Sequence, residues 1–398
     1  MYLLLSSLLA SLMYPFAAAT LSDQPETWIV QLALNASGDK VMDLLSHEAQ
    51  QTMVDTAWRA LVIYLSEEAR GALKEDPGVL AVYPNDPVTL PDWLEEEGER
   101  GTVGDEEVPP SWGLSRISRR NWLDPTDTGI SYLYPKTAGE GVEVFLLDSG
   151  IDASHPDLQG RGVNEATFVP GEPNRDVLGH GTHVAGVIAG AKYGVAKRAR
   201  IRSIKVLGRS GKGSVSGIMA GLLYVAQMPR TRAGARIVNM SLHTPQHPGL
   251  EEIVRLVRSR DVLIIASSGN AQMDACTISP SSLPRHVLSV GATNALDQAT
   301  PFTGIGRCLS IQAPGDQIRS LWLAHGYKTL SGTSGVAALF AAIHPQLHTQ
   351  ALRALILASG TRGRLKDLSP RTVNLLAYNW PEKLHRLGMD EHLDAKGG

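Results

Sequence analysis

The sequence predicts an α/β protein with a mostly parallel sheet and helices on both faces, preceded by a small α+β domain. From about residue 108, apolar runs alternate with helical segments, as they do in parallel sheets that are covered on both sides. Ahead of that point, two short strand-like runs flank a helical stretch. The expected strands of the large domain are 142–147, 201–207, 236–242, 262–266 and 287–290, and the expected helices are 181–190, 214–227 and 249–259.

Composition limits the class of protein. The chain has 398 residues, of which 43% are hydrophobic and 19% are charged, so it can bury one large core and a smaller one. A formal net charge of -3 gives no case for a nucleic-acid partner. The basic run at 197–202 is most simply a solvated edge of the fold.

The N-terminus is predicted to be a signal peptide over residues 1–19, because an apolar stretch ends in small residues at Ala17, Ala18 and Ala19. Pro15 interrupts a run that is already shorter than a membrane span of about 20 residues. The protein is therefore predicted to be secreted and extracellular, with no membrane attachment.

The small domain is expected to contain a strand at 28–32, a helix at 61–73, and a turn followed by a short strand within 74–86. An acidic stretch with eight carboxylates and one arginine follows and is predicted to be an exposed linker. The predicted divisions are a small domain at 22–90, the linker at 91–110, the large domain at 111–379 and a mobile C-terminal tail at 380–398.

The chain contains two cysteines, Cys276 and Cys308. In an oxidising compartment they can form a disulfide that closes a long loop, worth about 3 to 4 kcal/mol relative to the unfolded chain. The alternative is two unrelated buried thiols, since free cysteine behaves as a small hydrophobic residue.

His180 is the first candidate for a chemical role. The stretch that follows it, 184–189, has no polar face, which predicts a helix buried on all sides. A histidine in the first turn lies at the positive end of the helix dipole, which favours the neutral imidazole that a general base requires. The alternative is a core histidine that is satisfied by hydrogen bonds.

Three other residues complete a possible reaction centre. Asp148 ends the apolar run 142–147, where a buried carboxylate needs a partner such as an imidazole, although a turn role would also explain it. Ser334 precedes an apolar helical stretch and could be a nucleophile or merely an N-cap. Asn270 follows the expected strand 262–266, at the point where a second oxyanion donor is needed.

Four segments that contain these residues resemble the ordered sequence blocks of the subtilases. Their catalytic candidates occur in the order Asp, His, Ser, which is the order in subtilisin. The segments are 148–152, 179–186, 267–270 and 331–334. Further segments resemble the proteinase K and cerevisin branch of that family. These are 111–117, 193–197, 205–207 and 372–379, so the resemblance extends from about residue 28 to residue 379.

The resemblance implies a secreted serine endopeptidase with a subtilisin-like fold, made as a self-processing precursor that acts on proteins or peptides as a monomer. Asp148 would orient His180, which would act as general base and then acid, Ser334 would attack the peptide carbonyl, and Asn270 would stabilise the oxyanion. The domain at 22–90 would be the propeptide and an intramolecular inhibitor. Gly211, Lys212 and Gly213 would lie along the substrate as an edge strand, with Ser241 and Leu242 facing it.

The sequence departs from the family pattern at three places. After Ser334 the chain lacks seven residues of the usual block, about two helical turns. His243 and Thr244 replace two glycines and should reshape the substrate pocket. Ser310 stands where the branch often places the aspartate of a calcium site, so no metal and no cofactor are predicted.

Two rival interpretations follow from these observations. The first is a subtilase homologue that folds but does not cut, because the shortened block displaces Ser334. The second is a nucleotide-binding protein that uses the glycine-rich run 208–214, but the spacing of a phosphate loop is not met. A metal site at His180 and His183 fails because further ligands at a suitable spacing are missing from the sequence.

Overall fold

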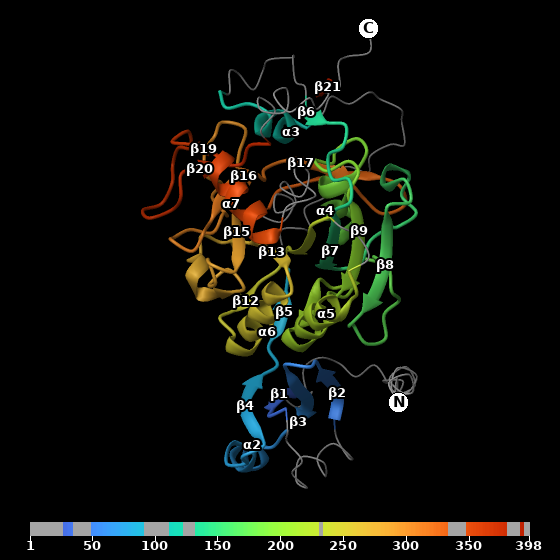
Figure 1. Cartoon of the computed structure of the whole chain (residues 1–398), viewed down its shortest axis with the longest axis vertical. Coiled ribbons are helices and arrows are strands. Elements are labelled where there is room, and N and C mark those ends of the chain that lie inside the picture. Colours follow the sequence, from blue (N-terminus) through green and yellow to red (C-terminus); the bar gives the residue numbers. More distant parts are fainter. Residues whose placement is uncertain are drawn as a thin grey trace.

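A computed structural model describes residues 27–34, 49–90, 111–121, 132–230, 234–332, 348–379 and 391–393. Figure 1 shows a small N-terminal unit, in blue, at one end of a larger α/β unit. The predicted signal peptide, the linker and Ser334 with its helix lie outside the described residues.

The large unit is built on a nine-stranded sheet whose pairs are parallel, except for an antiparallel pair at one edge. The strand order is β19-β20-β16-β15-β13-β11-β7-β9-β8. The α/β prediction is therefore correct, and the five expected strands form its centre. The strands are β7 (Glu143–Asp148), β8 (Gly162–Thr167), β9 (Arg200–Lys205), β11 (Arg236–Met240), β13 (Val262–Ser267), β15 (Val287–Thr293), β16 (Ile311–Pro314), β19 (Thr361–Arg362) and β20 (Leu375–Leu376).

The two faces of this sheet are covered by different helices, because alternate side chains of each strand point to opposite faces. Val144 and Leu146 of β7 belong to a core that contains residues of α4 and α7, whereas Phe145 and Leu147 belong to a core with residues of α5 and α6. Both faces are apolar, which explains why the central strands have no polar alternation. The helices are α3 (Trp112–Ile117), α4 (His180–Ala189), α5 (Val215–Gln227), α6 (Pro248–Ser259) and α7 (Thr349–Ser359).

Short elements complete the two units, and β5 belongs to the chain of the N-terminal unit although it pairs with β10 of the large one. Among them, β17 and β18 form an antiparallel hairpin that packs against α4. They are β5 (Pro87–Thr89), β6 (Leu133–Pro135), η2 (Pro156–Leu158), β10 (Lys212–Ser214), β12 (Thr244–Pro245), η3 (Ala275–Thr277), β14 (Ile278–Ser279), β17 (Ile318–Leu321), β18 (Tyr327–Leu330) and β21 (Glu391–Leu393).

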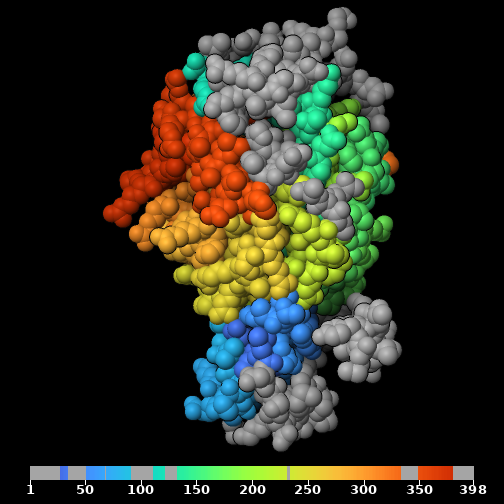
Figure 2. Space-filling view, in the orientation of Figure 1, coloured from blue at the N-terminus to red at the C-terminus, as the bar shows by residue number. Residues whose placement is uncertain are grey.

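The N-terminal unit is a four-stranded antiparallel sheet in the order β2-β3-β1-β4. One face packs against α2 through an apolar cluster that includes Leu61 and Leu73. The opposite face, with Met53 and Trp58, joins the core that α5 and α6 contribute to. Figure 2 shows the blue unit resting on the yellow and yellow-green surface of the large unit. The elements are β1 (Thr27–Leu32), β2 (Ala49–Val54), β3 (Arg59–Tyr64), α2 (Glu67–Lys74) and β4 (Val79–Pro84).

Two local predictions are wrong. The expected helix at 61–73 is strand β3 followed by the shorter helix α2, because Leu61 and Ile63 pack on one face of the small sheet while Ala60 and Val62 face the large unit. Within the expected mobile tail, β21 pairs with β6 in an antiparallel ladder. The second difference arises because β21 is held by backbone pairing. A strand of three residues is too short to be recognised from the periodicity of the sequence.

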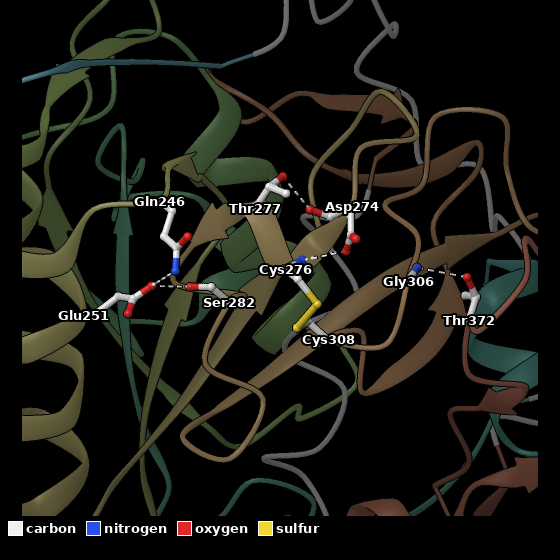
Figure 3. Close-up of a disulfide and its surroundings, with 9 residues drawn as sticks. All are labelled: Gln246, Glu251, Asp274, Cys276, Thr277, Ser282, Gly306, Cys308 and Thr372. Carbon is white, nitrogen blue, oxygen red and sulfur yellow. Dashed lines mark hydrogen bonds between the residues drawn. A yellow bond between two sulfur atoms is a disulfide. The ribbon is translucent and has the colours of Figure 1, made fainter.

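Cys276 and Cys308 form a disulfide, as one of the two interpretations of the sequence predicted. It joins η3 to the loop before β16 (Figure 3). The Cys276 N–H donates to Asp274 Oδ1 at 2.9 Å, and nearby the Gly306 N–H donates to Thr372 Oγ1 at 3.0 Å. The disulfide thus adds to the backbone hydrogen bonds between the same two loops, from the Ala275 N–H to the Ile305 carbonyl at 2.9 Å and from the Ile305 N–H to the Met273 carbonyl at 3.0 Å.

Replacing both Cys276 and Cys308 with serine is expected to lower the free energy of unfolding by about 3 to 4 kcal/mol, because the unfolded chain regains the entropy of the opened loop. Urea denaturation of the wild type and the double variant measures the difference. A loss well below 1 kcal/mol would contradict this prediction.

Candidate active site

Asp148 is the last residue of β7 and is fully buried at the carboxyl end of the strand. In the sheet, β7 lies next to β11, and β11 lies next to β13. Ser241 follows β11 and Asn270 follows β13 after a three-residue step, so three sequence-predicted residues lie at the same edge of neighbouring parallel strands. Sites form at this edge in open α/β sheets.

His180 is the first residue of α4, as the sequence predicted, and its side chain is buried. The helix start approaches the turn after Asp148 so closely that side chains cannot fit. A Cβ on Gly181 would lie 2.0 Å from the Gly150 carbonyl oxygen, and Gly150 itself has φ +101. Glycines at both positions therefore allow the contact that brings His180 to Asp148.

The two side chains are joined by a hydrogen bond. His180 Nδ1 lies 2.7 Å from Asp148 Oδ1, which also accepts the Ser149 N–H at 2.7 Å. A neutral imidazole that donates from Nδ1 has its lone pair on Nε2, the nitrogen that can accept a proton. This is the arrangement of the base and its orienting carboxylate in an acyl-transfer site.

The pKa of His180 is shifted in the direction opposite to the one that its place at the start of a helix predicted. Burial lowers the pKa of the imidazole, but the charge and hydrogen bond of Asp148 and the charge of Asp176 raise it, and the net direction is upward. Two carboxylates thus outweigh burial and the helix terminus. The protonated form of His180 is correspondingly stabilised.

Sequence analysis missed Asp176, a buried carboxylate four residues before His180. It accepts hydrogen bonds from the backbone N–H groups of Leu178, Gly179 and Thr182, all at 2.9 Å. An acidic residue just ahead of a predicted helix was the available signal, because such residues satisfy the unpaired N–H groups of the first turn.

Lys205 was also missed as part of this site. It ends β9 directly opposite Asp148 in the ladder, and its buried ammonium donates to the carbonyl oxygens of Ser149 at 2.9 Å and Leu207 at 2.8 Å. Glu172 Oε2 lies 3.1 Å from the same nitrogen. Lys205 therefore holds the backbone of the turn that follows Asp148.

The segment that leads to Ser334 is anchored, although Ser334 lies outside the described residues. The Gly332 N–H donates to the Gly315 carbonyl at 2.7 Å, and the Ser331 hydroxyl donates to Asp316 Oδ1 at 2.8 Å. Ser334 follows Gly332 by two residues, and two residues span at most about 7 Å.

The predicted substrate strand is paired with another part of the same chain. β10 forms an antiparallel ladder with β5, in which Gly213 faces Val88 and Lys212 faces Thr89. The Leu90 N–H donates to the Gly211 carbonyl at 2.9 Å, which extends the ladder by one more pair. This is strand addition to an exposed edge, the mode by which extended peptides are commonly bound.

Ser241 and Leu242, which were expected to face that strand, lie just after β11 and are both buried. Asn239 Nδ2 donates to the Ser241 hydroxyl at 2.9 Å. The next residue, His243, stands where the family pattern has a glycine. Burial lowers the pKa of its imidazole, which favours the neutral form.

A search of the described residues finds no group of three or more His, Cys, Asp or Glu side chains that could hold a metal ion. Ser310, the position considered for calcium, pairs its backbone N–H with the Ser289 carbonyl at 2.9 Å. Likewise, no described helix is long and apolar enough to cross a membrane.

The fold and the site together define a subtilisin-like α/β protein, and comparisons with known proteins agree. The Subtilase family model matches residues 139–374. The cuticle-degrading protease of Metarhizium anisopliae is 33% identical over 93% of this chain and 93% of its own. The subtilisin-like serine protease AsES of Sarocladium strictum is 32% identical over 94% of this chain and 98% of its own.

Among solved structures, a cold-adapted subtilisin-like serine proteinase matches with a TM-score of 0.63 and 34% identity, covering 69% of this chain and 99% of the other. The chain belongs to the Subtilase family. This confirms the family resemblance that the four sequence blocks indicated.

His183, one turn after His180, gives a pH-dependent prediction. Burial and the charge of His180 lower its pKa from 6.5 to about 3, so it is neutral in the folded protein. The unfolded chain takes up a proton on this residue first as the pH falls. The free energy of unfolding is therefore unaffected by His183 above pH 6.5. As the pH falls from about 6.5 to 3, this residue lowers the free energy of unfolding by up to about 1.4 kcal/mol per pH unit.

His183→Gln in a Ser334→Ala background, which prevents self-digestion, is expected to flatten the acid side of the stability curve. Urea unfolding at several pH values from 7 to 4.5 measures the difference in slope. His325→Gln, at an exposed histidine, controls for the loss of a histidine as such. Equal slopes for the Ser334→Ala parent and for the His183→Gln variant in that background would contradict the assignment of the acid sensitivity to His183.

Proposed function

We propose that the protein is a secreted serine endopeptidase that hydrolyses peptide bonds in proteins through Asp148, His180 and Ser334. The observation that carries this proposal is the buried hydrogen bond of 2.7 Å between Asp148 and His180 at the start of α4. The family membership supports the reaction class, and the anchored segment at Ser331 and Gly332 supports the delivery of Ser334 to the same edge.

In the proposed reaction, Ser334 Oγ attacks the carbonyl carbon of the substrate as its proton passes to His180 Nε2. Asp148 accepts the Nδ1 hydrogen bond and stabilises the imidazolium. The same proton then goes to the leaving amine, and water repeats the sequence to release the acyl group. Asn270 is proposed to donate to the oxyanion, a role typically worth a factor of about 100 to 1,000 in rate.

We further propose that the N-terminal unit is a propeptide that inhibits the site after self-processing. Its support is the ladder in which β5 occupies the edge of β10, where a substrate would bind. Just before this ladder, the Val215 N–H donates to the Asp86 carbonyl at 3.0 Å and the Ser216 N–H donates to Asn85 Oδ1 at 2.9 Å. The acidic linker that follows residue 90 would contain the bond that is cut.

The proposed inhibitory contact is reinforced away from the β5–β10 ladder. Glu252 of α6 accepts hydrogen bonds from Gln31 Nε2 at 2.8 Å and from Trp58 Nε1 at 3.3 Å. Arg260 pairs with Asp55, whose side chain is only 1% exposed. Burial raises the pKa of Asp55, but the Ala57 N–H and Arg260 together lower it below its ordinary value, so the pair is charged.

Export is supported by the apolar leader at residues 1–19 and by the disulfide, which an oxidising compartment favours. We propose that the processed enzyme acts outside the cell as a monomer. The substrate class is extended protein segments, since the β10 edge pairs with a backbone rather than with a particular side chain.

The first test compares the full-length precursor with its Ser334→Ala variant. The wild type is expected to cleave itself within 91–110 and to be labelled by an organophosphonate probe, which reacts only with an activated serine. The variant should do neither, and mass spectrometry of both proteins reads out cleavage and labelling. A soluble, folded wild-type precursor that neither cuts nor labels would contradict the proposed activity.

The second test weakens the propeptide contact at Arg260. Arg260→Ala leaves the buried Asp55 carboxylate unpaired, so the cleaved segment should dissociate about tenfold to a hundredfold more readily. Gel filtration of the processed protein measures retention of the segment, and the delay before full activity should shorten. Arg255→Ala, in the helix that ends just before Arg260 but paired with Glu251, is the matched control. Equal retention in both variants would contradict an inhibitory role for this contact.

A further inference from the structure

Asp176 joins two segments that the proposed reaction requires to be in register. Its Oδ2 accepts the Thr182 N–H at 2.9 Å and the Thr182 hydroxyl at 2.6 Å, both from the first turn of α4. Its Oδ1 accepts the Ser149 hydroxyl at 2.9 Å, and Ser149 immediately follows Asp148. A single carboxylate therefore contacts both the helix that carries His180 and the turn that carries Asp148.

Ser149 closes this link from the other side. Its hydroxyl oxygen accepts the Gly181 N–H at 2.9 Å while its proton is donated to Asp176. Asp176, Ser149 and Gly181 thus form a continuous chain of hydrogen bonds, and each of the three is buried. Asp148 and His180 lie at the two ends of the segments that this chain connects.

The contacts exceed those of a helix cap. A capping side chain accepts N–H groups at the start of a helix, which would account for the N–H of Thr182, and a turn side chain would account for those of Leu178 and Gly179 just before α4. It would not account for the hydroxyl of Ser149, which comes from a different strand end 27 positions away in sequence. That contact holds the turn after Asp148 in a fixed position relative to the first turn of α4.

We propose that Asp176 is a positioning residue of the active site, which locks the turn after Asp148 to the first turn of α4 and so fixes the geometry of the Asp148–His180 pair. This inference rests on the proposed function and adds to it a residue that touches neither substrate nor reacting atoms.

The charges around His180 are consistent with this role. Burial lowers the pKa of His180, and Asp148 and Asp176 raise it. Among the described residues, further charged or titratable groups near this region are Lys205 on β9, whose ammonium lies 3.1 Å from Glu172 Oε2, His183 on α4, and Asp152 in the turn after β7. The charges that raise the pKa of His180 are those of Asp148 and Asp176.

The test uses nuclear magnetic resonance on the precursor in a Ser334→Ala background, which keeps the chain intact. The first readout is the pKa of His180 from a pH titration of its ring resonances. The second is the proton on Nδ1, which a short hydrogen bond to a buried carboxylate shifts downfield and protects from exchange with water. Asp176→Asn is expected to lower the pKa of His180 and to speed exchange of the Nδ1 proton.

Asp152→Asn is the matched control. Asp152 lies in the chain segment that follows Asp148, but its carboxylate accepts hydrogen bonds from the backbone N–H and the hydroxyl of Ser154. It should move neither readout as far as Asp176→Asn does. A folded Asp176→Asn protein with the His180 pKa and Nδ1 exchange of the parent would overturn the proposal.

Ser149→Ala keeps the inference testable if Asp176→Asn does not fold. This variant retains the charge of Asp176 and removes only the link between the turn and the helix. The proposal is supported if the Nδ1 proton of His180 exchanges faster in Ser149→Ala than in the parent, while the pKa of His180 changes less than the loss of the Asp176 charge would change it. Unchanged exchange overturns it.

Neither readout requires hydrolysis. An enzyme that fails to cut or to label at Ser334 would therefore contradict the proposed function while leaving the Asp176 measurements interpretable.

Discussion

The close approach of the α4 start to the end of β7 is the constraint on which the site depends. Asp148 is fixed by a central strand that is buried on both faces, and His180 is fixed by a helix that is buried along its whole length. The two elements can meet at hydrogen-bonding distance only because Gly181 lacks a side chain, and the turn that it meets requires the φ of +101 that Gly150 adopts. Adding even a methyl group at Gly181 would displace the helix that carries His180.

The same approach creates an electrostatic problem that the surrounding residues resolve. The contact removes water from Asp148, His180 and Asp176 together, and a buried carboxylate is costly unless it is paired or hydrogen-bonded. Backbone N–H groups and hydroxyls satisfy Asp176, and His180 satisfies one oxygen of Asp148. Three residues further along the same helix, His183 has no such carboxylate, and burial lowers its pKa to about 3. Distance to a carboxylate, rather than depth of burial, therefore decides whether the pKa of each buried histidine is raised or lowered.

Much of this arrangement could be predicted from the sequence, because the signals were local. Strands buried on both faces gave continuous apolar runs, the all-apolar stretch after His180 gave a buried helix, and Asp148 stood where a strand ends. The failures were not local. The stretch at 61–73 is apolar enough for a helix, yet alternate side chains of β3 pack in two different cores. Asp176 had the sequence context of a simple cap, and its contact with Ser149 exists only in the folded chain. The pairing of β5 with β10 likewise joins segments more than 120 positions apart, which periodicity does not report.

The shortened block after Ser334 can be placed within this framework. The chain enters the block through Ser331 and Gly332, which are tied to the turn between β16 and β17. It leaves the block at α7, where the Thr349 N–H and hydroxyl both bind Asp261. The seven-residue difference from the family pattern that the sequence predicts lies between these two anchors. The entry anchor is two residues before Ser334, and the exit anchor is fifteen residues after it. The position of Ser334 is therefore restricted mainly from its N-terminal side, where two residues span at most about 7 Å from the hydrogen-bonded Gly332.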